Sequence, residues 1–290
     1  MNAIVKNYNI SDIKIKKDIK LCLVSDFHFS NKLDDLRFNK VLENIKNNKP
    51  DYICISGDFI DSSNVLEDKK VYDKSINYLK SLAEISKVIF TLGNHDICKI
   101  KNKKITYYLN DNWIKDICKI KNVIFLNNDI YEDNFIRFIG YAAYFKYYKK
   151  FNEDEKLLIK DFNKKIPNIK DDKFNMLLFH SPVRILSYKS LNNINALKNV
   201  NVILSGHMHN GLTPNFIDKI WKSNRGLVSP HRYFFPNNAR GIKRKEINNH
   251  DIFLIISGGV TKVHSLAPKM LHFLNGFYKP EVVYIKLGNN

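Results

Sequence analysis

The 290-residue sequence lacks any long apolar run and contains few cysteines. A membrane-spanning helix needs about 18 consecutive apolar residues, and no run approaches that length. The first twenty residues are mixed polar and lack the apolar stretch of a signal peptide. The four cysteines show no C-x-x-C spacing, and Cys22 and Cys54 lie inside apolar runs. We therefore expect buried free thiols and a reducing, cytoplasmic compartment.

Acidic residues are scarce relative to basic ones. Lys and Arg number 47 against 29 Asp and Glu, which gives a net charge of +18. Such an excess favours an anionic partner, such as a nucleic acid, a membrane surface or a phosphorylated substrate. Lys, Asn and Ile are abundant throughout, however, and no block of Lys and Arg stands out. We therefore favour a general compositional bias as the source of the charge.

Apolar residues are plentiful enough for a substantial core. They make up 44% of the chain and include 15 Tyr and 19 Phe, which argues against disorder. The length suits one large domain or two small ones. The sequence shows no internal repeat, low-complexity linker or break in composition. We therefore expect residues 1–290 to form a single domain.

The first part of the chain alternates apolar strands with amphipathic helices. The pattern predicts strands at 20–25, 52–56 and 88–92, separated by helices at 33–49 and 71–86. This alternation is typical of α/β sheets, which bind ligands at the carboxyl ends of their strands.

The rest of the chain is less regular. Residues 97–121 are expected to be helical, and 212–249 are expected to form a long irregular loop over the site. Two strands are expected around a polar turn, at 123–126 and 135–140. The remaining expected elements are a helix at 154–162 and strands at 174–179, 202–204, 252–256 and 281–287.

Residues suited to metal binding follow the predicted strands. His207 and His209 stand one residue apart after a buried strand, so in an extended segment they share a face. Two neutral imidazoles make good metal ligands, although such a pair alone is also common on surfaces. The other strand ends supply carboxylates, an amide and further histidines, so five of the nine His belong to one set. The whole set is Asp26, His28, Asp58, Asn94, His95, His180, His207 and His209.

This set resembles the calcineurin-like metallophosphoesterase superfamily. The motifs of that superfamily are D-x-H, G-D, G-N-H-D/E, a lone His and G-H-x-H. The resemblance spans about residues 21–211 and implies an α/β fold, a four-layer sandwich of two mixed β-sheets flanked by helices. The matching residues, in the same order, are Asp26-Phe27-His28, Gly57-Asp58, Gly93-Asn94-His95-Asp96, His180 and Gly206-His207-Met208-His209.

The resemblance also implies two divalent metal ions bridged by Asp58. One ion would be held by Asp26, His28, Asp58 and His209, and the other by Asp58, Asn94, His180 and His207. Such mixed oxygen and imidazole ligands suit Mn²⁺, Fe or Zn²⁺ better than Ca²⁺, and we expect Mn²⁺ first.

The resemblance implies a hydrolytic mechanism as well. By this resemblance, a hydroxide bound by the metals would attack phosphorus in line with the leaving oxygen. His95 would protonate the leaving group or stabilise developing charge. Asp96 either orients His95 or is a carboxylate at the start of a loop or helix.

Two departures separate the sequence from family protein phosphatases. Those enzymes carry G-D-x-x-D-R-G, whereas here Asp61 is followed by Ser62 and no Arg, and Asp96 replaces their Glu. The intact D-x-H motif and the G-H-x-H motif followed by Asn210 resemble bacterial diesterase-type and membrane-associated members. That branch includes enzymes acting on lipid-linked nucleotides, phospholipid headgroups and cyclic nucleotides. We therefore expect a phosphodiesterase with a small or lipid-linked phosphoester substrate and peripheral membrane contact. A metal-dependent nuclease and a non-catalytic adaptor with the same fold are the alternatives.

Two aromatic and basic segments are candidates for substrate contact. Within 212–249, Arg225, Arg232 and Tyr233 could stack on a base, hold a phosphate or enter a lipid interface. An ordered surface loop without a ligand is the alternative. For residues 141–151 we favour a half-buried strand and turn.

Overall fold

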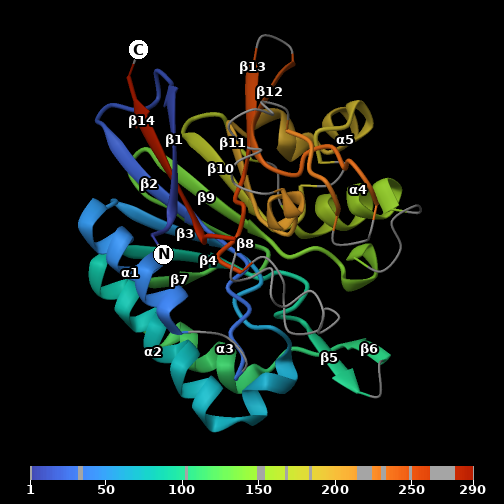
Figure 1. Ribbon diagram of the computed structural model, residues 1–290. Coiled ribbons are helices and arrows are strands. Elements are labelled where there is room, and N and C mark those ends of the chain that lie inside the picture. The colour runs from blue at the N-terminus through green and yellow to red at the C-terminus, as the bar shows by residue number, and fades with distance from the viewer. Residues whose placement is uncertain are drawn as a thin grey trace.

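The computed structural model describes residues 2–31, 35–101, 104–148, 154–166, 169–182, 185–213, 224–229, 233–247, 250–261 and 278–289. Within these residues, two six-stranded mixed sheets pack against each other, and helices cover their outer faces (Figure 1). The predicted four-layer α/β sandwich is therefore confirmed.

The first sheet has the strand order β1-β14-β2-β3-β4-β7. Neighbours from β2 to β7 run parallel, whereas β14 is antiparallel to β2 and parallel to β1. The strands are β1 (Ile4–Ser11), β2 (Ile19–Val24), β3 (Tyr52–Ser56), β4 (Lys87–Thr91), β7 (Val123–Phe125) and β14 (Glu281–Gly288).

The second sheet has the order β12-β13-β11-β10-β9-β8. Its four central strands run parallel, and the two edge strands are antiparallel to their neighbours. The strands are β8 (Asp129–Glu132), β9 (Ile136–Tyr141), β10 (Phe174–Phe179), β11 (Val202–Ser205), β12 (Gly241–Ile247) and β13 (His250–Ile256).

Helices line the outer face of each sheet (Figure 1). Helices α1 (Asp35–Asn48), α2 (Lys69–Ile85) and α3 (Asp111–Cys118) accompany the first sheet, and α4 (Asp154–Lys165) and α5 (Tyr188–Asn193) the second. Short 3₁₀ segments are η1 (Ser63–Glu67), η2 (Phe145–Tyr148), η3 (Asn195–Asn199) and η4 (His209–Leu212).

Three buried clusters hold these layers together. Val41, Leu79 and Trp113 belong to the cluster between the first sheet and its helices. Leu178 and Val283 belong to the cluster in which the two sheets meet. A third cluster joins the second sheet to α4 and α5. Each such side chain contributes about 1.5–3 kcal/mol by leaving water, so the sheets form one rigid support for the loops at their ends.

Local signals set the helix boundaries. The Asp68 side chain accepts a hydrogen bond from Lys70 N and caps α2, and Asn110 Oδ1 accepts one from Trp113 N and caps α3. These caps satisfy backbone donors that have no partner within the helix.

The irregular parts of the chain differ from expectation in three places. Residues 97–121 are not mainly helical, because β5 (Cys98–Lys101) and β6 (Lys104–Tyr107) form an antiparallel hairpin before α3. The strands expected at 123–126 and 135–140 are present as β7 and β9, but they lie in different sheets, and the segment between them contains β8, which pairs with β9. The segment 212–249 is not irregular throughout, because residues 241–247 form the edge strand β12. Exposed or charged strands of this kind carry little of the apolar pattern that identifies a buried strand.

The cysteine prediction is confirmed for Cys22 and Cys54, which are free and buried. Among the described residues, no helix is both long and apolar enough to span a bilayer.

Candidate metal centre

The carboxyl ends of parallel strands from both sheets meet at one edge of the sandwich. Asp26 follows β2, Asp58 follows β3 and Asn94 follows β4, whereas His180 follows β10 and His207 follows β11. The sheets are joined at this edge by Ser56 Oγ, which donates a hydrogen bond of 2.9 Å to Leu204 O. The topology therefore brings the expected ligands together from distant parts of the sequence.

Five of these residues have left-handed backbone conformations. The φ angle is 53° at Asp26, 52° at His28, 53° at Asp58, 69° at His207 and 47° at His209. Asp and His tolerate this region better than most residues, but each such conformation costs on the order of 1–3 kcal/mol. Strain is therefore concentrated at this edge of the sheets.

The ligand atoms form three overlapping groups, in each of which they lie within 4.8 Å of one another. The first group is Asp26, His28 and His209. The second is Asp58, His180 and His207. A third group, in which His95 joins His28 and Asp58, links the other two.

Asp58 lies between the histidines of both groups. Its Oδ2 is 3.0 Å from His180 Nε2 and 3.8 Å from His28 Nε2. Burial opposes ionisation of Asp58, but His180, His95 and His28 outweigh it and hold the pKa of the carboxyl well below its usual range. An ionised carboxylate in this position can serve two cations at once.

Backbone carbonyls orient two of the imidazoles. His180 Nδ1 lies 2.7 Å from Ser56 O, and His209 Nδ1 lies 2.7 Å from Thr261 O. A carbonyl only accepts, so Nδ1 carries a proton in both rings and Nε2 faces the site. His209 Nε2 lies 3.6 Å from Asp26 Oδ1.

The two imidazoles differ in basicity. Burial alone would lower the pKa of His180, but the adjacent Asp58 carboxylate raises it to about 9. Burial dominates at His209 and lowers its pKa to about 4. Without a metal, the Asp58–His180 contact is therefore an ion pair, and a metal ion bound there would replace the proton on Nε2.

Asn94 and Asp26 complete the oxygen ligands. Asn94 Oδ1 is buried and has no hydrogen-bond partner among the described residues, which a neutral metal ligand explains. Both carboxylate oxygens of Asp26 accept from His207 N, at 3.0 and 3.1 Å, and Ser25 Oγ donates to Asp26 Oδ2. The donor set of carboxylate, amide and imidazole fits divalent transition metals.

His95 lies at the rim of this group and is half-buried. Its backbone N donates to Asp58 Oδ1 at 2.8 Å, and its Nδ1 lies 2.6 Å from Asp61 O. The His95 ring meets that of His28 edge-on, with 4.6 Å between the centroids. Nδ1 is occupied by the carbonyl, which leaves Nε2 for chemistry.

Asp96 has structural partners. Its Oδ2 accepts from Asp58 N and Gly93 N at 2.8 Å, and its Oδ1 accepts from Phe59 N at 2.9 Å and Ile60 N at 3.0 Å. Burial, and next the Asp58 charge, raise the pKa of Asp96 to about 7, against the effect of these backbone donors. The carboxylate thus joins the loops after β3 and β4, whereas the contact described above for the His95 ring is with Asp61.

Asp61 was not predicted as a site residue. Asp61 is fully buried, and its Oδ1 lies 3.3 Å from His28 Nδ1. Burial by itself would lower the pKa of His28, but Asp61, Asp58 and Asp26 together raise it. A carboxylate behind a metal-binding imidazole fixes the ring and makes it more basic. The signal was present in the sequence, because Asp61 stands three residues after Asp58 in the same loop.

Two of the three expected substrate residues can be placed. Leu227 N and Val228 N both donate to Gly211 O, so the segment 224–229 packs against Gly211, which lies two residues after His209. Arg225 is exposed and its Nε donates to Asn237 Oδ1 at 3.1 Å, and Tyr233 is 49% exposed. Arg232 lies outside the described residues.

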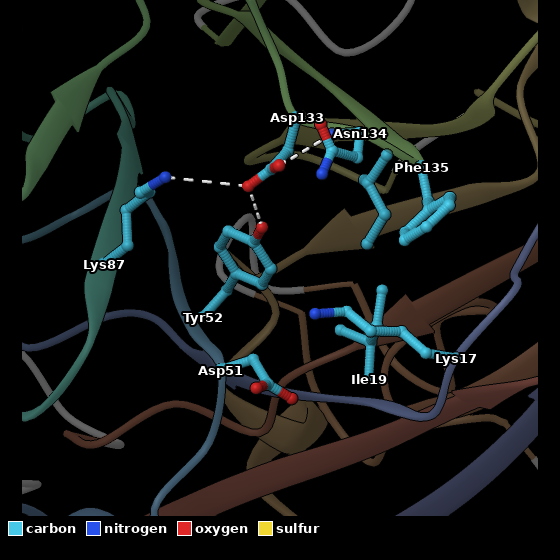
Figure 2. A pocket seen from close by; sticks show the side chains of 9 residues that line it. Lys17, Ile19, Asp51, Tyr52, Lys87, Asp133, Asn134 and Phe135 are labelled. Carbon is cyan, nitrogen blue, oxygen red and sulfur yellow. Dashed lines mark hydrogen bonds and ion pairs between the residues drawn. The ribbon is translucent and has the colours of Figure 1, made fainter.

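A separate pocket lies at the opposite end of the strands (Figure 2). It is lined at the starts of β3 and β4 by Tyr52 and Lys87 and, before β9, by Asp133. The Tyr52 hydroxyl donates to the Asp133 carboxylate, and Lys87 Nζ lies 3.6 Å from it. Its charged groups neutralise one another, and it contains none of the predicted ligands.

Comparisons with known proteins agree with this geometry. The family model described as calcineurin-like phosphoesterase matches residues 19–211. An uncharacterized metallophosphoesterase of Campylobacter jejuni is 26% identical over 208 residues, which cover 71% of this chain and 48% of the relative. Another from Aquifex aeolicus is 25% identical over 253 residues, covering 82% of this chain and 84% of the relative.

The chain thus spans about half the length of the Campylobacter relative. Among solved structures, a phosphopantetheinyl hydrolase from Mycobacterium tuberculosis aligns with 86% of this chain and 93% of its own, at 12% identity and a TM-score of 0.43.

Proposed function

The chain belongs to the calcineurin-like phosphoesterase family, and we propose that it is a two-metal phosphodiesterase acting on a small or lipid-linked phosphoester. The observation that carries this proposal is the position of Asp58, whose Oδ2 lies near imidazoles of two separate ligand groups.

The proposed metal ligands divide between the two groups. Asp26, His28, Asp58 and His209 would hold one divalent ion, and Asp58, Asn94, His180 and His207 the other. When bound, such ions lower the pKa of a water molecule and neutralise phosphoryl oxygens. We propose Mn²⁺ as the native metal, with Fe and Zn²⁺ as the other metals suited to these ligands.

His95 is proposed as the proton donor to the leaving oxygen. The bond between its backbone N–H and Asp58 Oδ1 fixes its position relative to the metal ligands. Its Nδ1 is held by Asp61 O, so proton transfer occurs at Nε2.

A preference for diesters is supported by the charges within the site. The sequence has no Arg soon after Asp58, where family protein phosphatases carry one. A phosphodiester bears one negative charge and needs less cationic compensation than a monoester dianion. The site therefore suits a diester better.

The first test compares an aryl phosphodiester with the matching monoester. Protein loaded with Mn²⁺ is expected to hydrolyse the diester with the higher kcat/KM and to lose activity when the metal is chelated. Asp58→Asn should abolish this activity, whereas Asp73→Asn, on the exposed side of α2, should retain it. Preference for the monoester would contradict the diesterase proposal. Activity retained in both Asp58→Asn and Asp73→Asn would contradict the assignment of Asp58.

The competing functions predict different results. A nuclease would degrade DNA in Mn²⁺ with a salt-dependent affinity, since phosphate contacts release counterions. An adaptor would bind no metal or would hydrolyse neither ester despite bound metal. Either result would replace the phosphodiesterase proposal.

We also propose that a membrane surface is a partner. Tyr233, Phe234 and Phe235 are 49%, 76% and 56% exposed, and Phe234 pairs with Val228, whose backbone N donates to Gly211 O two residues after His209. Exposed aromatic side chains on a chain of net charge +18 suit an anionic bilayer. Cosedimentation with phosphatidylglycerol vesicles, but not with phosphatidylcholine vesicles, is expected, and replacing the three residues by Ala should weaken it. Equal binding to both kinds of vesicle would contradict the charge argument.

A further inference from the structure

Tyr148 lies beside the metal centre but has no place in the mechanism above. It is the last residue of η2, which follows β9. Its ring centroid lies 5.7 Å from that of His207 and 6.3 Å from that of His180. Tyr148 therefore borders two histidines of the same proposed metal ligand set.

The Tyr148 hydroxyl is buried without a hydrogen-bond partner among the described residues, and the residue is 8% exposed. Two other buried tyrosines are satisfied: the Tyr141 hydroxyl donates to Asp161 at 2.7 Å and the Tyr78 hydroxyl to Phe38 O at 2.9 Å. An unsatisfied buried hydroxyl costs about 1–3 kcal/mol. Phe would fill the same space without that cost. The presence of a hydroxyl here therefore indicates that it binds a ligand.

The phenol is also in the right protonation state to donate. An unperturbed tyrosine hydroxyl has a pKa of about 10, so it is a neutral hydrogen-bond donor near neutral pH. A negatively charged phosphoryl oxygen would be a suitable acceptor for this hydroxyl, because charged acceptors form stronger hydrogen bonds than neutral ones.

We propose that the Tyr148 hydroxyl donates a hydrogen bond to a nonbridging oxygen of the phosphoryl group bound at the metal centre. This inference rests on the proposed phosphoesterase function. A preorganised donor in a buried site costs little reorganisation and stabilises charge on the phosphoryl oxygens as the bond to the leaving group breaks. Tyr148 would then be a catalytic residue that acts beside the metal ligands.

The test is Tyr148→Phe, with Tyr147→Phe as the matched control. Tyr147 is the adjacent buried tyrosine, and its ring packs on that of Phe179. We expect Tyr148→Phe to lower kcat/KM for the aryl phosphodiester by roughly 10- to 100-fold, the range for a hydrogen bond to a charged group. Metal content should stay at the wild-type level. Tyr147→Phe should change kcat/KM by less than about threefold.

A second measurement separates a ligand role from a structural one. Without phosphate, Tyr148→Phe should match or exceed the wild-type Tm, because no protein hydrogen bond is lost. With inorganic phosphate and Mn²⁺, the rise in Tm should be smaller in Tyr148→Phe than in the wild type or Tyr147→Phe. A lower Tm without phosphate, or an unchanged phosphate response together with unchanged kcat/KM, would overturn the inference.

The two proposals can fail separately. If the wild type hydrolyses the diester and Tyr148→Phe does so equally well, the phosphodiesterase proposal stands and the role of Tyr148 is contradicted. If the wild type hydrolyses neither ester, but phosphate raises its Tm more than that of Tyr148→Phe, the phosphodiesterase proposal is contradicted. Tyr148 would then stand as a hydrogen-bond donor to phosphate.

Discussion

Individual residues at the metal centre combine unfavourable features. Asp26, His28 and Asp58 are fully or almost fully buried, ionisable and held at positive φ. The loop conformations persist because buried hydrogen bonds fix them, above all the four backbone N–H groups that converge on Asp96. The ligands are therefore oriented before a metal arrives, at the expense of local stability.

Asp61→Asn should weaken metal binding without removing a ligand. The change removes the charge behind His28 but keeps the size of the side chain and the backbone carbonyl that holds His95. Residues behind a ligand typically alter metal affinity or activity by about 10- to 100-fold. Competition with a fluorescent chelator would measure the loss of Mn²⁺ affinity. Asp73→Asn serves as the surface control, and equal affinities in the two variants would remove Asp61 from the metal centre.

His95→Asn should separate metal binding from turnover. His95 is proposed to deliver a proton from Nε2. The variant should therefore keep its metal, but its kcat should fall by about 10²-fold or more. Metal analysis and kcat at saturating Mn²⁺ would be measured on the same sample. The proton-donor role would be contradicted by normal kcat. Loss of bound metal would instead identify His95 as a ligand, as its place beside His28 and Asp58 permits.

At the scale of elements, the turn after β4 is packed against the loop after β3. A Cβ added at Gly93 would lie 2.2 Å from Asp58 Oδ1 and 2.4 Å from Asp58 N. Gly93→Ala should therefore displace Asp58 and abolish metal binding while the sheets remain folded. Far-ultraviolet circular dichroism and metal analysis would check this. Gly288→Ala is the control, because the nearest atom to its Cβ is Asp18 Oδ1 at 3.1 Å. Full metal content in Gly93→Ala would show that the turn can adjust.

The strands that carry the ligands could be predicted because they are buried. β2, β3, β4, β10 and β11 are short, mainly apolar and buried runs, and residues suited to metal binding follow each of them within a few positions. The β5–β6 hairpin could not be predicted in this way, because all four residues of β6 are exposed. β12 was hidden for a related reason: its lysines and arginine suit an edge strand but not an apolar pattern.

At the scale of the whole molecule, the site could be predicted only in part. The ligands could be predicted from their motifs, since each stands within a few residues of the end of a strand. Asp61 and Tyr148 were not, because their relation to His28 and His207 depends on how loops from different strands pack. Tyr148 was expected in a half-buried strand and turn, and its burial beside the ligands arises only when η2 folds against the second sheet.

The proposed metal ligands come from both sheets, so bound metal should stabilise the whole sandwich. Asp26, Asp58 and Asn94 follow strands of the first sheet, whereas His180 and His207 follow strands of the second. An ion present at 100 times its Kd adds about 2.7 kcal/mol to the free energy of unfolding. For a chain of this size that corresponds to a rise in Tm of roughly 5 °C for each ion.

Thermal unfolding should therefore show a higher Tm with Mn²⁺ than with a chelator, in one cooperative transition. His180→Ala removes a ligand contributed by the second sheet and should reduce this difference, whereas Asp73→Asn should leave it unchanged. An equal Tm with Mn²⁺ and with the chelator would contradict a metal centre held between the two sheets. Two separate unfolding transitions in the chelated protein would show that, without metal, the apolar interface between the sheets does not make them unfold together.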